Sequence, residues 1–364
     1  MSATERREIG IAVVGLGYWG PNLLRVLADV PDVAVRWMCD LDEDRLARFG
    51  RRYPAIGTTQ SLAEVLADPE VDGVVIATPV HTHVALCKAA IAAGKHVFVE
   101  KPMATSSEAA TELSELAAEQ DLTLMCGHTF IYSPAVRAVK SLIDEGALGK
   151  IFFITSSRVN LGLHQRDVSV IWDLGPHDFS ILIHWLGEVP TTVRATGRDS
   201  IVPGIPDVAF ITLEFPSGIV ASVELSWLSP SKLRRTVVVG GDKMVVYDDG
   251  AAEPVRVFDH GVVYEDPETF GEYHLSYRTG DIVSPRLDTF EPLQAEMLDF
   301  TQGIREGDRL TEHTALACAV VRVTEAAERS LRTGGDIVEI EPVSATGPAG
   351  TDRSSLAAPA APVV

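Results

Sequence analysis

Two short segments carry side chains suited to moving a proton to or from a hydroxyl group. In the first, Glu100 and Lys101 end the apolar run Val97-Phe98-Val99, and Pro102 follows at once. A proline restricts the preceding residue to extended geometry, which fixes the direction of Lys101. A lysine held there can donate a hydrogen bond to a substrate hydroxyl or to the carbonyl formed from it. The alternative is an ion pair that caps the strand.

The second segment is Trp172-Asp173-Leu174-Gly175-Pro176-His177-Asp178. Gly175 and Pro176 indicate a helix start near Pro176, because proline is tolerated in the first turn. Asp173 and His177 are four residues apart, near enough for the carboxylate to orient the imidazole. A histidine that titrates near neutral pH is a natural base for a hydroxyl proton. A lone histidine at such a place is more often structural, but its pairing with Asp173 favours chemistry.

The start of the chain predicts the element that these groups serve. The apolar run Ile11 to Val14 leads into the G-x-G-x-x-G pattern Gly15-Leu16-Gly17-Tyr18-Trp19-Gly20, and a helical pattern follows. Strand, tight turn and helix in this order are typical of a dinucleotide-binding unit. In such a unit Gly15 allows the turn, Gly17 lets the backbone approach the pyrophosphate, and Gly20 lets the helix pack against the strand.

Asp40 indicates which dinucleotide is bound. It ends a second apolar segment, Val33 to Cys39, 20 residues beyond Gly20. A carboxylate at this point accepts hydrogen bonds from the adenosine ribose hydroxyls and repels a 2′-phosphate. We therefore expect NAD as the cofactor in preference to NADP.

The order of elements predicts an α/β protein of two domains. Strand and helix patterns alternate up to Cys126, as a parallel, doubly wound Rossmann sheet requires. Successive strands with short turns then predict an open, mostly antiparallel sheet, accompanied by helices. We expect an NAD-binding domain at 1–126, an α/β domain for substrate binding and oligomerisation at 127–343, and a disordered low-complexity tail at 344–364.

Composition excludes several classes of partner. The 364 residues include 31 Lys and Arg against 51 Asp and Glu, a net charge of −20. Nucleic acid and anionic membranes require basic patches, so we expect neither. No apolar run approaches the ~20 residues of a membrane span, and the N-terminus lacks a signal-peptide core, which predicts a cytoplasmic protein. His81 and His83 have no further ligand at a suitable spacing, so we expect no metal.

The motifs together resemble the glucose–fructose oxidoreductase, inositol dehydrogenase and MocA (Gfo/Idh/MocA) family over roughly residues 8 to 342. GLGYWG, ATP-x-x-x-H at 77–83, EKP at 100–102 and D-x-G-x-H at 173–177 occur in the family's order. The resemblance implies that Lys101, Asp173 and His177 form the catalytic group. It implies a cofactor site made of Gly15, Gly17, Tyr18, Trp19, Gly20, Asp40, Thr78, Pro79, His83, Glu100 and Lys101.

Two positions refine this resemblance. Val80 stands where many members carry asparagine, which removes one polar cofactor contact. His177 stands where members that reduce ketosugars often carry tyrosine, which favours oxidation of an alcohol.

Two more segments, Gly127 to Pro134 and Arg158 to Gly162, resemble the branch that oxidises nucleotide-linked N-acetylamino sugars, or their uronates, at C3. Similar sequences also serve in amino-sugar antibiotic pathways. The branch implies a substrate site made of His128, Tyr132, Arg158, Asn160, Trp172, Asp173 and His177. The family also implies that the open sheet supports a homodimer or a homotetramer.

We therefore expect an NAD-dependent dehydrogenase of a secondary alcohol, at C3 of a pyranose, the substrate being a nucleotide-linked or free amino sugar. His177 takes the hydroxyl proton and Lys101 polarises the developing carbonyl. The alternatives are a keto-sugar reductase that runs the reverse reaction, a cyclitol (inositol-type) dehydrogenase, and a catalytically silent NAD-binding sensor. A sensor needs the three glycines but not the catalytic group, whose presence argues against it.

Overall fold

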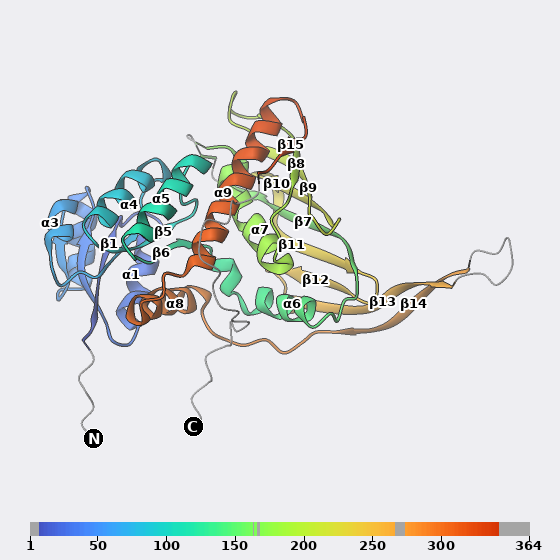
Figure 1. The fold of residues 1–364 in the computed structure, drawn as a ribbon, viewed down its shortest axis with the longest axis horizontal. Helices are drawn as coiled ribbons and strands as arrows, with labels where there is room; N and C mark the ends of the chain where they lie inside the picture. The colour runs from blue at the N-terminus through green and yellow to red at the C-terminus, as the bar shows by residue number, and fades with distance from the viewer. Residues whose placement is uncertain (1–6, 163, 166–167, 266–273, 342–364) are drawn as a thin grey trace, which may run out of the picture.

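The computed structural model describes residues 7–162, 164–165, 168–265 and 274–341. Two β-sheets organise these residues, one in each half of the molecule (Figure 1). The predicted fold class is confirmed. The expected boundary between residues 126 and 127 stays a prediction, and the tail expected at 344–364 lies outside the described residues.

The first sheet is a six-stranded parallel Rossmann sheet. Its strands are β1 (Ile9–Val14), β2 (Val33–Cys39), β3 (Gly57–Thr59), β4 (Gly73–Ile76), β5 (His96–Glu100) and β6 (Leu124–Gly127). They are arranged in the order β3-β2-β1-β4-β5-β6, so the order reverses between β1 and β4. Ligands bind at the carboxyl edge of such a sheet, beside the reversal.

Helices cover both faces of this sheet, and the central strands β1 and β4 are buried as a result. The helices of this half are α1 (Gly20–Asp29), α2 (Glu43–Arg52), α3 (Leu62–Ala67), α4 (His83–Ala92) and α5 (Ser107–Glu119). Two later helices, α8 (Pro292–Glu306) and α9 (Thr311–Arg332), return to the sheet from the end of the chain. Ile11 and Val13 pack with α1 and α8, whereas Ala12 and Val14 share a core with α4, α5 and α9.

The second sheet has nine strands. They are β7 (Ile151–Leu161), β8 (Thr192–Arg198), β9 (Val208–Glu214), β10 (Val220–Ser226), β11 (Leu228–Gly240), β12 (Met244–Asp248), β13 (Val255–Glu265), β14 (His274–Val283) and β15 (Val338–Glu339). Their order is β14-β13-β12-β11-β7-β10-β9-β8-β15. β10 pairs with β7 in parallel, and the other neighbouring pairs whose register is described are antiparallel.

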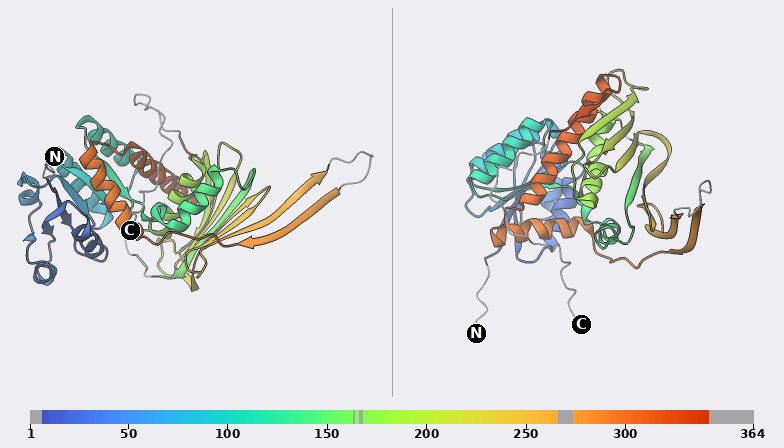
Figure 2. Two further views of the ribbon diagram at one scale, coloured as in Figure 1. Left: turned by 90° about the horizontal axis from the view of Figure 1, so that it is seen from below. Right: turned by 45° about the vertical axis from the view of Figure 1, so that its right-hand side comes forward.

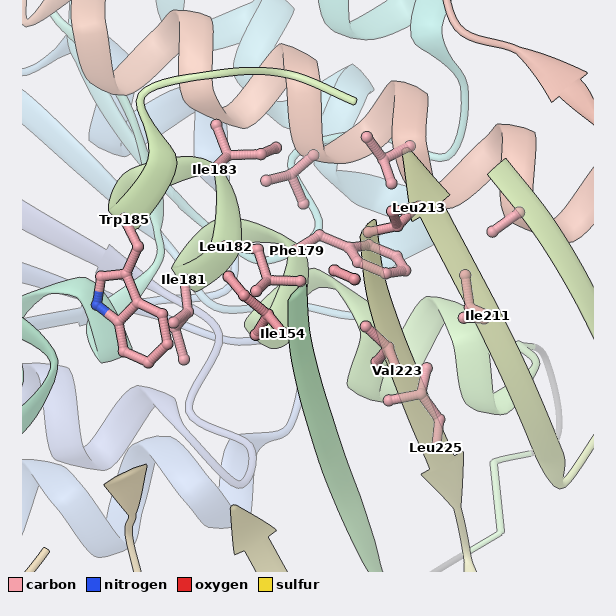
Figure 3. Packing of buried hydrophobic residues seen from close by; sticks show 14 of the residues in the cluster. Ile154, Phe179, Ile181, Leu182, Ile183, Trp185, Ile211, Leu213, Val223 and Leu225 are labelled. Carbon is pink, nitrogen blue, oxygen red and sulfur yellow. The ribbon is translucent and has the colours of Figure 1, made fainter. Parts of the chain in front are cut away.

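One face of this sheet packs against α6 (Pro134–Asp144), α7 (Val170–Leu186) and α9. Phe179 and Trp185 of α7 are fully buried, and Figure 3 shows Phe179 lying among Ile211, Val223 and Leu225 of the sheet. Along β10, Val223 and Leu225 are buried on the inner side. This packing holds α7 rigidly against the second sheet.

The sequence missed three strands. β3 has three residues, too few for a period-2 pattern to be recognised. β13 and β14 form a hairpin that reaches away from the body (Figure 2). In β14 the residues from 278 to 283 are exposed, so this part of the strand buries no apolar face and gives no clear alternation.

The predicted start of α7 near Pro176 is wrong. The helix begins at Val170, so Pro176 lies in its interior. An interior proline costs about 3 kcal/mol. The first turn offsets this cost because Val170 and Ile171 are fully buried. As a consequence, Asp173 and His177 lie one turn apart on the same helix.

The other face of the second sheet has no helix on it in Figure 1 and carries exposed aromatic and aliphatic side chains. Phe153 is 44% exposed, Phe210 53% and Val220 40%, and Phe153 and Val220 are register partners on neighbouring strands. Apolar patches of this kind are uncommon on monomers.

We expect a second copy of the chain to cover this face. Light scattering at micromolar concentration should give a dimer or a tetramer, and the double substitution Phe153→Asp with Phe210→Asp should shift it towards monomer. A single 39.2 kDa species for the unmutated protein would contradict the expectation.

No described helix combines the length and the apolar character needed to cross a membrane.

Candidate active site

A cavity of about 1400 Å³ lies at the carboxyl edge of the first sheet and extends to α7 and β11 of the second half. Residues after β1, β2, β4 and β5 line one end, and Asp173 and His177 line the other. The cavity therefore joins the glycine-rich turn to the two segments that were expected to do chemistry. Of the predicted residues, those that line it are Gly15, Gly17, Tyr18, Trp19, Asp40, Thr78, Pro79, Glu100, Lys101, Asp173 and His177.

The glycine-rich turn has the geometry that a pyrophosphate requires. Gly15 has φ +95°, and a Cβ there would lie 2.5 Å from the carbonyl oxygen of Ala77. A Cβ on Gly20 would lie 1.9 Å from the carbonyl oxygen of Gly15, so this glycine allows α1 to pack close to the strand. At Gly17 the nearest atom to a Cβ would be 3.9 Å away, which leaves open space beside the backbone. The turn thus fits a dinucleotide above the N-terminus of α1.

The carboxylate of Asp40 is oriented by two backbone groups. Oδ2 accepts a hydrogen bond from the Leu16 N–H at 2.6 Å, and Oδ1 accepts one from the Asp42 N–H at 2.9 Å. Arg45 lies beside it, with Nη1 3.5 Å from Oδ2. Each oxygen keeps a lone pair for a ribose hydroxyl, so the site fits the ribose of NAD.

We expect the unmutated protein to bind NAD more tightly than NADP, and Asp40→Asn to narrow the difference. The amide keeps the shape of the side chain but removes the charge that repels a 2′-phosphate. Fluorescence titration of both cofactors against both proteins measures the gap. Tighter binding of NADP by the unmutated protein would refute the assignment.

His83 does not line the cavity, although it was expected to lie beside the cofactor. Its ring is buried between two carbonyl groups, with Nδ1 2.9 Å from the Pro102 oxygen and Nε2 2.9 Å from the Thr78 oxygen. His83 therefore ties together the turns after β4 and β5, both of which contribute lining residues. His83 would therefore support a bound cofactor indirectly, by holding these two turns in place.

The side chain of Lys101 reaches from the end of β5 in the first sheet to α7. Its Nζ donates a hydrogen bond to the backbone carbonyl of Asp173 at 2.8 Å and lies 3.6 Å from Oδ1 of the same residue. Oδ2 of Asp173 accepts a hydrogen bond from the indole N–H of Trp227 at 3.0 Å. Asp173 therefore holds Lys101, and Trp227 holds Asp173. The contact in which Asp173 would orient His177 is not formed among the described residues.

His177 lines the cavity, and its imidazole forms a T-shaped pair with Phe130, the ring centroids being 5.0 Å apart. No described residue makes a hydrogen bond with this ring. Burial, together with the positive charges of Lys101 and Arg158, holds the pKa of His177 well below its ordinary value. The ring is therefore neutral at pH 7 and free to accept a proton.

Five residues expected to contact the substrate do not line the cavity: His128, Tyr132, Arg158, Asn160 and Trp172. Two of them, Arg158 and Tyr132, make polar contacts with other side chains. Arg158 forms a buried ion pair with Asp178, Nε to Oδ2 2.5 Å, and lies 4.5 Å above the Phe130 ring. The Tyr132 hydroxyl donates a hydrogen bond to Asp299 at 2.5 Å. In the described residues, carboxylates engage the polar atoms of these two side chains: the buried Asp178 for Arg158 and the partly exposed Asp299 for Tyr132.

The sequence missed an arginine and an aspartate at the far end of the cavity. Arg234 on β11 forms an ion pair with Asp249, Nη1 to Oδ2 2.9 Å, and both line the cavity. The basic run at 232–235 was the available signal.

Among the described residues, no three His, Cys, Asp or Glu side chains are grouped closely enough to hold a metal ion.

The site combines a dinucleotide turn, a neutral imidazole and a lysine held by a carboxylate. These groups can take a proton from a hydroxyl and stabilise the oxygen as its carbon loses hydride.

Comparison with known proteins gives the same picture. Residues 9–128 match the model of an oxidoreductase family with an NAD-binding Rossmann fold, and residues 136–246 match the GFO/IDH/MocA C-terminal domain. The scyllo-inositol 2-dehydrogenase (NAD(+)) of Bacillus subtilis (strain 168) is 30% identical over 61% of this chain and 68% of its own. The 2,7-anhydro-N-acetylneuraminate hydratase of Escherichia coli (strain K12) is 31% identical over 59% of this chain and 61% of its own.

The crystal structure of GenD2 from gentamicin A biosynthesis, in complex with NAD, has a TM-score of 0.78 to this chain. It is 27% identical, and the similarity covers 93% of this chain and 97% of GenD2. The expectation of NAD as the cofactor is confirmed.

Proposed function

This chain belongs to the Gfo/Idh/MocA family of NAD-binding oxidoreductases, and from that premise we propose that it oxidises a ring hydroxyl of a pyranose. The substrate is an amino sugar, free or nucleotide-linked, and the hydroxyl is the one at C3. The observation that carries this proposal is that Lys101 and His177 line the same cavity as the glycine-rich turn. Lys101 follows a strand of the first sheet, whereas His177 lies on α7, which packs against the second sheet.

The described residues suggest how each group acts. NAD, when bound, supplies the hydride acceptor. His177, neutral at pH 7, takes the proton from the substrate hydroxyl. The ammonium of Lys101 donates a hydrogen bond to the same oxygen and stabilises the charge that develops as the carbonyl forms. Asp173 is a positioning residue, because its carbonyl and carboxylate hold Nζ of Lys101 in place.

Three observations support an amino sugar. The segments 127–134 and 158–162 resemble the branch that acts on such sugars. The hydratase relative acts on a derivative of N-acetylneuraminate, itself an N-acetylated amino sugar, and the GenD2 structure comes from gentamicin A biosynthesis. In the cavity, Arg234 and Asp249 offer donors and an acceptor for a polar substituent near His177.

A cyclitol is the second candidate substrate. The scyllo-inositol 2-dehydrogenase relative favours it, because a cyclitol offers the same secondary alcohol on a six-membered ring. Reduction of a keto-sugar by the same residues in reverse is the third.

A panel of nucleotide sugars, free amino sugars and cyclitols, monitored for NADH absorbance, tests the proposal. We expect the highest kcat/KM with an N-acetylamino sugar or its nucleotide conjugate, and the 3-deoxy analogue should give no NADH. Higher kcat/KM with a cyclitol would assign the second function. NAD binding without turnover of any compound, in either direction, would indicate a sensor.

A further inference from the structure

Buried polar atoms without partners lie beneath the cavity, near the end of β5. Oε1 of Glu100, Oε1 of Glu296 and both ring nitrogens of His128 are buried and make no hydrogen bond to any described residue. Folded proteins contain few such atoms, and each one calls for an explanation. Of these three residues, Glu100 lines the cavity. The mechanism above gives it no role.

Glu100 is placed where the reactive half of a dinucleotide binds. It is the last residue of β5, which neighbours β4 at the carboxyl edge, on the far side of the order reversal from β2. Gly127, its register partner on β6, packs against it so closely that a Cβ there would lie 3.1 Å from Oε2. In sheets of this type the adenosine half lies over β2, here at Asp40, and the nicotinamide half lies across the reversal.

The groups that face Glu100 come from each element around it. Lys101 follows it, and the backbone N–H of Lys101 donates to Oε2 at 3.3 Å. Cys126 of β6 and Glu296 of α8 are buried, and burial holds the pKa of each well above its ordinary value. The Cys126 thiol is therefore neutral at pH 7, and the shift favours the protonated form of Glu296. His128, whose pKa burial lowers to about 3, is neutral as well. Across the cavity, His177 is neutral and Asp173 is paired with Lys101.

Lys101 is thus the charged group that opposes the effect of burial on Glu100. Burial raises the pKa of Glu100 to about 7, even though Lys101 and the indole N–H of Trp19 lower it. Near neutral pH the carboxyl group of Glu100 is therefore close to half protonated. A positive charge placed beside it favours the carboxylate, and loss of that charge favours the carboxylic acid. The nicotinamide ring carries such a charge when oxidised and loses it when reduced.

We propose that Glu100 is a proton store coupled to the cofactor: it is a carboxylate when NAD⁺ is bound and a carboxylic acid when NADH is bound. The overall step is R₂CHOH + NAD⁺ + Glu100 carboxylate → R₂C=O + NADH + Glu100 carboxylic acid. The carbon is oxidised by loss of hydride and NAD⁺ is reduced by gaining it. His177 takes the hydroxyl proton and releases it to water, and Glu100 takes up one proton, so the overall step balances. The proton reaches water when NADH leaves. This inference rests on NAD binding and not on which sugar is oxidised.

Proton uptake on cofactor binding tests the proposal without any substrate. In weakly buffered solution with a pH indicator, NADH binding at a pH slightly above 7 should take up protons, and NAD⁺ binding slightly below 7 should release them. The ratio Kd(NAD⁺)/Kd(NADH) should fall as pH rises through 7, by up to about 10-fold per pH unit for one linked proton. In Glu100→Gln, both the proton exchange and the pH dependence of this ratio should be lost.

Two matched variants separate Glu100 from other titrating groups. Glu112→Gln removes an exposed carboxylate of α5 that pairs with Lys88, and it should keep the proton exchange. His177→Ala removes a titratable ring that lines the cavity on the side of α7, and it should keep the exchange too. Retention by Glu100→Gln together with loss in His177→Ala would overturn the proposal, as would the absence of exchange in the unmutated protein.

Infrared difference spectra of the unmutated protein give a second readout that does not depend on the folding of a variant. Replacing bound NAD⁺ by NADH should produce the carbonyl band of a protonated carboxylic acid, and no such band would overturn the proposal. Because both measurements use cofactor alone, a failed search for the sugar substrate leaves them unaffected.

Discussion

His177→Ala will lower turnover by roughly 10²–10⁴-fold, the usual contribution of a positioned general base. The imidazole lines the cavity and is neutral at pH 7, because burial and neighbouring positive charges hold its pKa well below its ordinary value. Without it, the hydroxyl proton has to pass to water as the carbon loses hydride. Steady-state formation of NADH with the best substrate of the panel measures the loss.

Two controls accompany this variant. NAD affinity should change little, because the pyrophosphate is held at the glycine-rich turn, at the other end of the cavity. His184→Ala removes a histidine from the same helix that does not line the cavity, and its turnover should stay close to that of the unmutated protein. Near-normal turnover of folded His177→Ala would remove this residue from the mechanism and direct the search for a base to Lys101.

Lys101→Ala should do comparable damage, about 10²–10³-fold, because it removes a charged donor from the developing carbonyl oxygen. Lys101→Met, which keeps the apolar stem, should be equally impaired if the charge is what matters. Both variants should bind NAD nearly as well as the unmutated protein.

Chemical rescue makes the test for Lys101 sharper. The four native cysteines are buried, so bromoethylamine should alkylate only the new thiol of Lys101→Cys and place an ammonium near the original position. Turnover should then recover substantially, whereas alkylation with iodoacetamide should not restore it. Equal recovery with both reagents would show that bulk, and not charge, is needed.

The parts of this site that sequence could predict are those encoded by short, local patterns. The glycine-rich turn follows its strand directly, and Lys101 follows the strand that fixes it, so neither depends on distant residues. Asp40 was predictable for the same reason, as the last residue of an apolar run. Their places on one sheet edge then follow from the parallel order of the strands.

The parts that sequence missed depend on contacts between distant segments. Asp173 was paired with His177 because they are close in sequence, but its partners are Lys101 and Trp227, which directly follow β5 and β10. Arg158 was assigned to the substrate, yet the buried carboxylate of Asp178, the residue next to His177, engages it. The spacing of residues in the sequence does not reveal which of several possible partners a side chain binds in the fold.

Helix boundaries show the same limit. Pro176 is a sound signal for a first turn, but the burial of the preceding residues carries α7 back to Val170. The early start matters for the site, because it places Asp173 in the first turn of the helix, where its carbonyl and side chain both reach Lys101.

Single-turnover formation of NADH by the unmutated protein, His177→Ala, Lys101→Ala and the double variant tests the central claim most directly, which is that the two residues act as one unit on one hydroxyl. We predict that the double variant is slowed little more than the worse single variant, because residues that act together lose most of their effect when either is removed. Rate losses that multiply in the double variant, or single variants that keep near-normal rates while folded and bound to NAD, would contradict the claim.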